Sequence, residues 1–352
     1  MVLRALDLFS GIGGITHGLR EIVKPVAFVE KNDDARAFLK KKHPTVPVFD
    51  DVCSFDTTTW VDKVDIITAG WPCTGFSNAG TKTGFSHEAS GLFTEVVRIT
   101  KECRPKYLFL ENSHTLSLPE NVSVVVSAFD ELGYDCRWTT CRATCVSALH
   151  QRHRWFCLVV RRDVEIDFVV SYIEKFDWSA NEPPRQIKKS TKENILHISL
   201  AGNAVVPDQV RYAMEILCSF EPEKYPCSSR TKSGFSKNGV VFMRDVKHPA
   251  REPLNIVLRP RDNEASFVVL CDPKKALTKP VIQKYWPTPL HSNKYATKCP
   301  RTLTKRVSKM LSACVGFSEG GDKSGYLSAE WVLWLMGYDD KYMSPLTPIF
   351  NC

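Results

Sequence analysis

The 352-residue chain has no long hydrophobic segments and no closely paired cysteines. None of its apolar runs approaches the roughly 20 residues that a membrane-spanning helix needs, and no secretory signal peptide is recognisable. Its 13 cysteines are scattered, without a Cys-x-x-Cys pair, which argues against a disulfide framework. We therefore expect an intracellular protein that is neither secreted nor bound to a membrane.

Cys136, Cys141, Cys145 and Cys157 are close enough in sequence to be considered as zinc ligands. Their spacings are irregular, and they lie in an apolar region that resembles strands more than a metal-binding loop. We expect no metal site here.

Acidic residues are absent from residues 273–318, a stretch of 46 residues with ten Lys or Arg. Residues 1–220 carry 26 basic and 27 acidic residues, whereas residues 221–352 carry 21 and 12. The excess positive charge therefore lies entirely in the C-terminal part of the chain. This asymmetry favours a polyanionic partner over the alternative, an ordinary solvated basic face.

The first half of the chain alternates short apolar runs with amphipathic segments, which indicates an α/β fold with a mostly parallel sheet. The expected strands are Leu3–Phe9, Val26–Val29, Val46–Phe49, Val64–Ala69, Tyr107–Leu110, Tyr134–Cys141 and Trp155–Val160. One expected helix runs from Gly14 to about Glu21, and a second follows the Val26–Val29 strand and ends at Phe38. Three more cover Leu92–Cys103, Val122–Leu132 and Pro207–Phe220. Residues 163–200 show no clear pattern, and the α/β rhythm stops near Glu221, where we place a domain boundary.

A glycine-rich turn at residues 10–14 follows the first expected strand. Such a turn lets a ligand approach the backbone, and the following helix offers free N–H groups to a carboxylate. Glu30 ends the second strand, where an acid can bind two ribose hydroxyls, and Asp51-Val52 can contact an adenine edge. The turn lacks the third glycine of the dinucleotide-binding pattern, and the chain lacks the second β-α-β half of that fold. Both absences favour S-adenosylmethionine over NAD.

Two candidate catalytic residues follow later strands. Cys73 lies in a Pro/Gly-rich turn after the strand that ends at Ala69, where α/β proteins place ligand clefts. A thiol there can act as a nucleophile once it is ionised. Glu111 ends the next expected strand and can act as an acid toward a ring nitrogen. Taken alone, Glu111 is equally consistent with an ordinary strand-end acid, and Cys73 is better explained as a buried or incidental thiol.

Two arginines, Arg152 and Arg154, precede the last expected strand of this region. Side chains two residues apart in an extended segment point to the same side, so both guanidinium groups can bind a phosphate or a carboxylate. A solvated basic edge is the alternative.

Together these motifs resemble those of the C5-cytosine DNA methyltransferases. The resemblance rests on Asp7-Leu-Phe-Ser-Gly-Ile-Gly-Gly14, Gly70-Trp-Pro-Cys-Thr-Gly-Phe-Ser77, Glu111-Asn-Ser113, Arg152-His-Arg154, Gly202-Asn-Ala-Val-Val-Pro207 and Leu327-Ser-Ala-Glu-Trp-Val-Leu-Trp-Leu-Met-Gly-Tyr338. The motifs cover nearly the whole chain, and their joint occurrence is highly specific.

The resemblance implies a Rossmann-like methyltransferase core in residues 1–220, a smaller, irregular, β-rich target-recognition domain in residues 221–326, and a segment, residues 327–352, that returns to the core. It assigns catalysis to Cys73, Glu111, Arg152 and Arg154. The implied S-adenosylmethionine site comprises Asp7, Phe9, Ser10, Gly11, Gly13, Glu30, Lys31, Asp51, Val52, Pro72, Leu92, Asn203, Ala204 and Val205. The expected DNA contacts are Ser77, Lys294, Lys298, Arg301, Thr302, Lys305 and Arg306.

The chain departs from the family pattern at four points. His150 stands where the family usually has Gln, Ala89 where Arg is common, and Ser113 where Val is usual. The Gly-Asn motif also precedes the Leu-Ser-Ala-Glu-Trp motif, which reverses the usual order. Such a rearranged chain can build the same fold if the joined ends are neighbours.

The implied reaction is methylation of cytosine at C5 in double-stranded DNA. The Cys73 thiolate adds to C6 of a flipped-out base, while Glu111 stabilises a proton at N3. Because the first motif begins at residue 3, we expect a stand-alone, monomeric modification enzyme of a microbe, phage or virus, acting in a microbial cytoplasm or in a virus-infected host cell. A tRNA cytosine-5 methyltransferase and a catalytically inactive DNA-binding homologue remain the alternatives.

Overall fold

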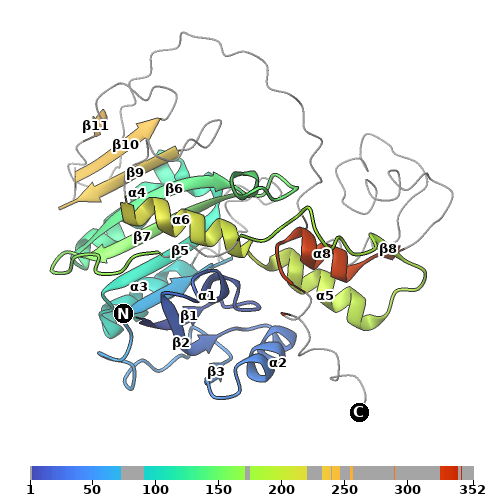
Figure 1. Cartoon of the computed structure of the whole chain (residues 1–352). Helices are drawn as coiled ribbons and strands as arrows, with labels where there is room; N and C mark the ends of the chain where they lie inside the picture. Colours follow the sequence, from blue (N-terminus) through green and yellow to red (C-terminus); the bar gives the residue numbers. More distant parts are fainter. Residues whose placement is uncertain are drawn as a thin grey trace, which may run out of the picture.

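The computed structural model describes residues 2–72, 91–170, 175–219, 232–238, 240–245, 254–256, 289, 326–339 and 342. These residues form a ten-stranded sheet flanked by helices and a separate two-stranded sheet (Figure 1). The large sheet has the strand order β11-β10-β9-β6-β7-β5-β4-β1-β2-β3. Strands β1 to β5 are mutually parallel, and β7 runs antiparallel to β5 and β6. This confirms the Rossmann-like α/β fold.

The strands of the large sheet are β1 (Leu3–Leu8), β2 (Val23–Val29), β3 (Val48–Phe49), β4 (Ile66–Ala69), β5 (Tyr107–Ser113), β6 (Tyr134–Arg142), β7 (His153–Arg161), β9 (Lys232–Lys237), β10 (Val240–Asp245) and β11 (Leu254–Ile256). The small sheet pairs β8 (Gln186–Ile187) with β12 (Tyr326–Leu327). The helices are α1 (Gly14–Gly18), α2 (Asp33–Lys42), α3 (Leu92–Cys103), α4 (Pro119–Glu131), α5 (Lys192–Asn203), α6 (Pro207–Ser219) and α8 (Ala329–Leu335).

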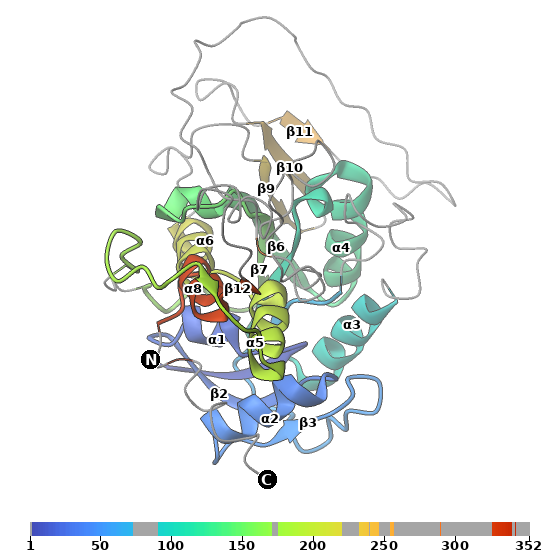
Figure 2. The same ribbon diagram turned by 90° about the vertical axis from the view of Figure 1, so that its right-hand side faces the viewer.

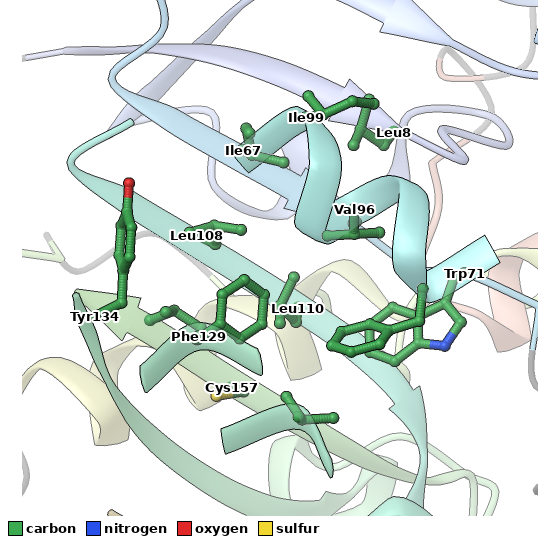
Figure 3. Close-up of a cluster of buried hydrophobic side chains, with 14 of the residues drawn as sticks. Leu8, Ile67, Trp71, Val96, Ile99, Leu108, Leu110, Phe129, Tyr134 and Cys157 are labelled. Atoms are coloured by element: carbon green, nitrogen blue, oxygen red, sulfur yellow. The ribbon is translucent and has the colours of Figure 1, made fainter. Parts of the chain in front are cut away.

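Apolar side chains cover both faces of the central strands. On one face, Val96 and Ile99 of α3 and Phe129 of α4 pack against Ile67 and Leu108 (Figure 3). On the other face, α1 and α6 cover the sheet, and Figure 2 shows the two pairs of helices on opposite sides. A fully buried aliphatic or aromatic side chain contributes about 1.5–3 kcal/mol, so these two layers stabilise the sheet and fix the positions of its strand ends.

A third apolar cluster joins segments that are distant in sequence. Phe38 of α2, Ile198 of α5 and Trp331 of α8 belong to it. The side chain of Ser328 caps α8 by accepting a hydrogen bond from the N–H of Trp331 at 3.4 Å. The segment that begins at Tyr326 is therefore packed against the first part of the chain.

Most predicted elements are present, with differences at their ends. Helix α3 has the predicted bounds, whereas α1 ends at Gly18 instead of near Glu21. A side chain at Gly18 would lie 2.6 Å from the carbonyl oxygen of Pro207, so α1 is packed tightly against the start of α6. Helix α5 lies in the region where no pattern was recognised.

Strand β9 lies beyond the predicted boundary at residue 220 yet continues the sheet of the first segment. It pairs antiparallel with β6 through Arg137–Phe235 and Trp138–Gly234. Strands β10 and β11 extend the same edge. The division of the chain into three segments stays a prediction. The first strands of the predicted middle segment, β9 to β11, belong to the same sheet as the core.

Candidate active site

Three neighbouring parallel strands bring the predicted motifs to one edge of the sheet. Strand β1 leads into the glycine-rich turn, β4 leads to Trp71-Pro72, and β5 carries Glu111 two residues before its end at Ser113. Because β4 lies between β1 and β5, their carboxyl ends are adjacent, which is where ligands bind in open α/β sheets.

The glycine-rich turn has a backbone that few side chains tolerate. Gly11 and Gly13 have φ angles of 55° and 76°, and Phe9 also has a positive φ. The hydroxyl of Ser10 donates to the carbonyl of Asp7 at 2.7 Å and so closes the turn. A Cβ on Gly11 would meet no atom of the described residues within 4 Å, so these residues leave open space beside this backbone.

Glu30 ties the turn to the end of β2. One carboxylate oxygen accepts the N–H of Gly11 at 2.7 Å, and the other accepts the N–H of Asn32 at 2.7 Å. Each oxygen keeps a lone pair for a further donor. The structure thus gives Glu30 a role in shaping the turn, and its predicted contact with a ribose stays a prediction.

Asp7 lies beneath the turn and is 1% exposed. The hydroxyl of Thr68 donates to its carboxylate at 2.7 Å. Burial raises the pKa of Asp7 to about 7, although the hydrogen bond from Thr68 acts in the opposite direction. Asp7 can therefore support the turn from below, and its side chain is not on the exposed surface.

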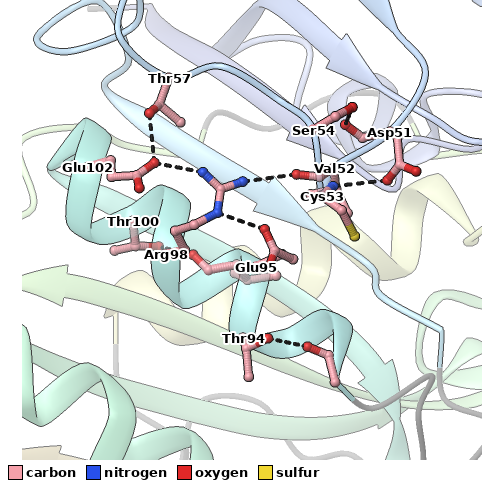
Figure 4. Close-up of polar contacts among 12 residues, drawn as sticks. Asp51, Val52, Cys53, Ser54, Thr57, Thr94, Glu95, Arg98, Thr100 and Glu102 are labelled. Carbon is pink, nitrogen blue, oxygen red and sulfur yellow. Dashed lines mark hydrogen bonds and ion pairs between the residues drawn. The ribbon is translucent and has the colours of Figure 1, made fainter.

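The loop after β3 holds Asp51 and Val52 in a defined conformation (Figure 4). Asp51 accepts the N–H of Cys53 at 2.9 Å and forms an ion pair with Lys31 at 3.0 Å. These two contacts, the Cys53 N–H foremost, lower the pKa of Asp51. The predicted residues Lys31 and Asp51 are therefore in contact at the end of β2.

Arg98 of α3 fastens this loop to the helix, a role the sequence reasoning did not assign. It donates to the carbonyl of Val52 at 3.0 Å and pairs with Glu95 at 2.7 Å and Glu102 at 2.8 Å (Figure 4). The i, i+3 and i, i+4 spacing of these charges is typical of ion pairs along one helix face. It did not indicate the contact with Val52, which lies 46 residues away.

The turn that leads to Cys73 starts from a fixed position. Trp71 is 2% exposed, and its carbonyl accepts a hydrogen bond from the side-chain amide of Asn112 at 3.2 Å. Pro72 is exposed, and Cys73 lies outside the described residues. Asn112 was recognised only as a neighbour of Glu111, and the structure shows that it holds the backbone two residues before Cys73.

Glu111 and Arg154 are brought together from β5 and β7. Their ion pair has an N–O distance of 2.8 Å, and Glu111 is 8% exposed. A Cβ on Gly70 would lie 3.2 Å from a carboxylate oxygen of Glu111. Thus the carboxylate lies beside the backbone that leads into the cysteine turn, and Arg154 balances its charge.

Arg152 and His150 are buried next to this ion pair. Arg152 is 3% exposed, and its backbone N–H donates to Nδ1 of His150 at 3.3 Å. Burial, together with the charges of Arg152 and Arg154, lowers the pKa of His150 to about 3. His150 is therefore neutral near pH 7, like the Gln that the family usually has at this position.

The Gly-Asn motif packs onto the glycine-rich turn. Val205 is 7% exposed, and a Cβ on Gly14 would lie 2.8 Å from its side chain. The hydroxyl of Tyr338 donates to the carbonyl of Val205 at 2.8 Å. Ala204 is buried beside it, whereas Asn203 is exposed at the end of α5.

The other predicted cofactor residue, Leu92, is half-buried at the start of α3. The predicted DNA contacts lie outside the described residues, and they are Ser77, Lys294, Lys298, Arg301, Thr302, Lys305 and Arg306. Their assignment stays a prediction.

The four cysteines considered for zinc do not converge. Cys136 and Cys157 belong to the core under α3 and α4, whereas Cys141 and Cys145 belong to the core on the opposite face. Within the described ranges, no group of three or more His, Cys, Asp or Glu side chains has the arrangement of a metal site. Cys145 is disulfide-bonded, which the scattered spacing did not predict.

Comparison with known proteins agrees with this geometry. The model of the C-5 cytosine-specific DNA methylase family matches residues 3–312. The chain is 44% identical over 367 residues to Type II methyltransferase M.CviJI of Paramecium bursaria Chlorella virus IL3A, which covers 98% of this chain and 99% of that protein. It is 31% identical over 281 residues to Type II methyltransferase M.NlaIV of Neisseria lactamica, with 74% of this chain and 62% of that protein covered.

Among solved structures, the S. pombe Dnmt2 methyltransferase is similar with a TM-score of 0.40 and 18% identity, covering 47% of this chain and 53% of that one. No helix in the described part of the chain is long and apolar enough to cross a membrane. The match over most of the chain and the near-full-length relative lead to one conclusion: this chain belongs to the C-5 cytosine-specific DNA methylase family.

Proposed function

We propose that the protein transfers a methyl group from S-adenosylmethionine to C5 of a flipped-out cytosine in double-stranded DNA. The observation that carries this proposal is the position of Glu111. Its carboxylate lies beside Gly70, at the start of the segment that leads to Cys73, and is paired with Arg154 at 2.8 Å. The acid thus lies beside the strand end from which the chain continues toward Cys73, the nucleophile of this proposal.

The residues at the end of β1 and β2 suit the cofactor. The positive φ angles of Gly11 and Gly13 expose backbone, and the space beside Gly11 admits a ligand. Glu30 and the Asp51-Val52 loop would hold the ribose and the adenine, and the neighbouring Asn203, Ala204 and Val205 would close the other side. The bound cofactor would supply an electrophilic methyl group and leave as S-adenosylhomocysteine.

The side chains act on the cytosine. The Cys73 thiolate adds to C6, which makes C5 electron-rich. Glu111 holds a proton at N3 and so neutralises the charge that develops on the ring, while Arg154 keeps Glu111 in place. After C5 has accepted the methyl group, loss of its proton restores the double bond and expels Cys73.

The similarity to Type II methyltransferases supports a role in DNA modification of the restriction–modification type. We further propose that the protein acts as a monomer inside a microbial or virus-infected cell. The test is transfer of a labelled methyl group to duplex DNA and, in parallel, to tRNA. Label in DNA alone supports the proposal, label in tRNA alone supports the RNA alternative, and label in neither indicates an inactive homologue.

A further inference from the structure

A cavity of about 420 Å³ lies between α1 and the end of α2, over the first residues of β2. Val2, Val23 and Pro25 line it, and these residues belong to the amino ends of β1 and β2. Glu111 lies at the opposite, carboxyl edge of the sheet. The cavity is therefore separate from the candidate active site, although Gly13 of the glycine-rich turn forms part of its wall.

Among the described residues no carboxylate lines the cavity, whereas five of its lining side chains are basic. They are His17, Arg20, Lys24, Lys42 and His43. They come from three elements, namely α1 and its following turn, β2, and the end of α2. Lys42 and His43 at the end of α2 are also explained by the helix dipole, which favours cations there. Arg20 has the same explanation, because it follows the end of α1 and donates to the carbonyl of His17, whereas Lys24 on β2 does not.

The basic groups already affect one another. Burial foremost, and then the charges of Arg20, Lys42 and His43, lower the pKa of His17 to about 3. Burial also lowers the pKa of Lys42. An anion among these groups would relieve the repulsion and replace the lost hydration.

Two of the cations are held in position. Lys42 donates to the carbonyl of Tyr342 at 3.0 Å, and its ammonium lies 3.6 Å from the centre of the Tyr342 ring. Arg20 donates to the carbonyl of His17 at 3.0 Å. The rings of His17 and Tyr342 lie 4.3 Å apart and form an aromatic wall next to these cations.

We propose that this cavity binds a nucleoside monophosphate. Arg20, Lys24 and Lys42 would hold the phosphate, and the ring system would lie against Pro25 and the wall of His17 and Tyr342. A phosphate alone would leave most of the volume unfilled, whereas cavities of this size typically enclose small organic ligands.

The test is calorimetric titration of the full chain with AMP, with inorganic phosphate and with adenosine. We expect saturable binding of AMP, weaker binding of phosphate, and the weakest binding of adenosine. The double substitution of Arg20 and Lys24 to Ala should raise the Kd for AMP at least about tenfold. Both side chains are exposed, so the fold should tolerate the change, and an unaltered melting temperature would check this.

The matched control is the double substitution of Lys40 and Lys41 to Ala. These lysines are exposed on α2 but do not line the cavity, so AMP should bind to this variant as to the wild type. Equal AMP affinity in all three proteins, or no AMP binding by the wild type, would overturn the proposal. Loss of duplex DNA affinity in the first variant without AMP binding by the wild type would assign the cations to a nucleic acid instead.

Discussion

At the scale of single residues, the chemistry depends on how burial and pairing set the charge of each side chain. Glu111 has a cationic partner in Arg154 at 2.8 Å, whereas Asp7 is buried next to the hydroxyl of Thr68. The pKa of Asp7 is therefore raised to about 7. Two carboxylates near the ends of nearby strands thus have different partners, an arginine for Glu111 and a hydroxyl for Asp7.

Substitution of Glu111 by Gln should lower the rate of methyl transfer about 100-fold, because an amide cannot supply the charge that stabilises a proton at N3. Binding of DNA and cofactor should change little, since Gln keeps the size and one acceptor oxygen. Single-turnover rates and separate binding titrations check both statements. The control is Glu120 to Gln, at an exposed position at the start of α4, and equal rates for all three proteins would contradict the role of Glu111.

Asp7 should make stability depend on pH. Because burial raises its pKa from 3.8 to about 7, the native state keeps a proton that the unfolded chain loses between these pH values. The contribution of Asp7 to the free energy of unfolding is thus full below pH 4 and falls as the pH rises to 7, by up to about 4 kcal/mol.

Urea unfolding of the wild type and of Asp7 to Asn at several pH values measures this effect. The amide does not titrate, so the wild type should lose stability relative to the variant as the pH rises. Asp163 to Asn is the control, because pairing with Arg161 lowers the pKa of Asp163. A difference between wild type and Asp7 to Asn that is independent of pH would contradict the raised pKa.

At the scale of helices, strands and loops, the last described residues hold the turns that we assign to the cofactor. The hydroxyl of Tyr342 donates to the carbonyl of Ile12 at 2.6 Å, and that of Tyr338 donates to Val205 at 2.8 Å. Both carbonyls lie next to residues of the predicted site. The late segment therefore positions two loops that begin far away in the sequence.

Substitution of Tyr338 and Tyr342 by Phe, singly, should raise the Kd for S-adenosylmethionine about 2- to 12-fold. Each change removes a hydrogen bond worth about 0.5–1.5 kcal/mol, and the loop it holds becomes less well ordered. Calorimetry measures the change. Tyr107 to Phe is the control, because its hydroxyl donates to Glu165, which lies far from these loops in the sequence, and equal effects at all three positions would indicate general destabilisation.

The burial pattern of each helix explains whether it could be predicted from the sequence. Helix α3 is recognisable because Phe93, Val96, Ile99 and Cys103 follow a helical spacing and are all buried. Helix α5 is not, because its buried residues are confined to its second half, from Ile198 to Gly202. A helix whose first half is at most partly buried has no continuous apolar face to detect.

Candidate site residues follow the same rule. Glu30 and Glu111 were identifiable because each ends an apolar strand. The roles of Asn112 and Tyr342 were not, because their partners, Trp71 and Ile12, lie 41 and 330 residues away. Contacts of this kind depend on tertiary packing, which a local pattern does not contain.

At the scale of the whole molecule, charge separates the chain into a neutral part with the candidate active site and a basic part. The basic segment Lys274–Lys309 carries ten cations and no acid. Apart from Pro289 it lies outside the described residues, so its role as a DNA-binding face is a prediction from sequence.

If Lys294, Lys298, Arg301, Lys305 and Arg306 each touch a phosphate, log K for DNA should fall with log salt by about 0.9 per contact. Replacing one of them by Ala should flatten the slope by about one unit and leave cofactor affinity unchanged. Filter binding over a range of salt concentrations measures the slope, with Lys188 to Ala as the control. Unchanged affinity and slope after substitution of all five residues would exclude this segment as the DNA-binding face.

The central claim is that Cys73 forms a covalent bond to the cytosine of duplex DNA, and one measurement tests it directly. A fluorine at C5 of the target cytosine cannot leave as a proton does, so after methylation Cys73 cannot be expelled. Wild-type protein incubated with S-adenosylmethionine and such a duplex should give a protein–DNA adduct that survives denaturation and whose peptide mass places the link at Cys73. Cys73 to Ser should give none. An adduct at another residue, or transfer of methyl groups by the serine variant at a near-normal rate, would contradict the account.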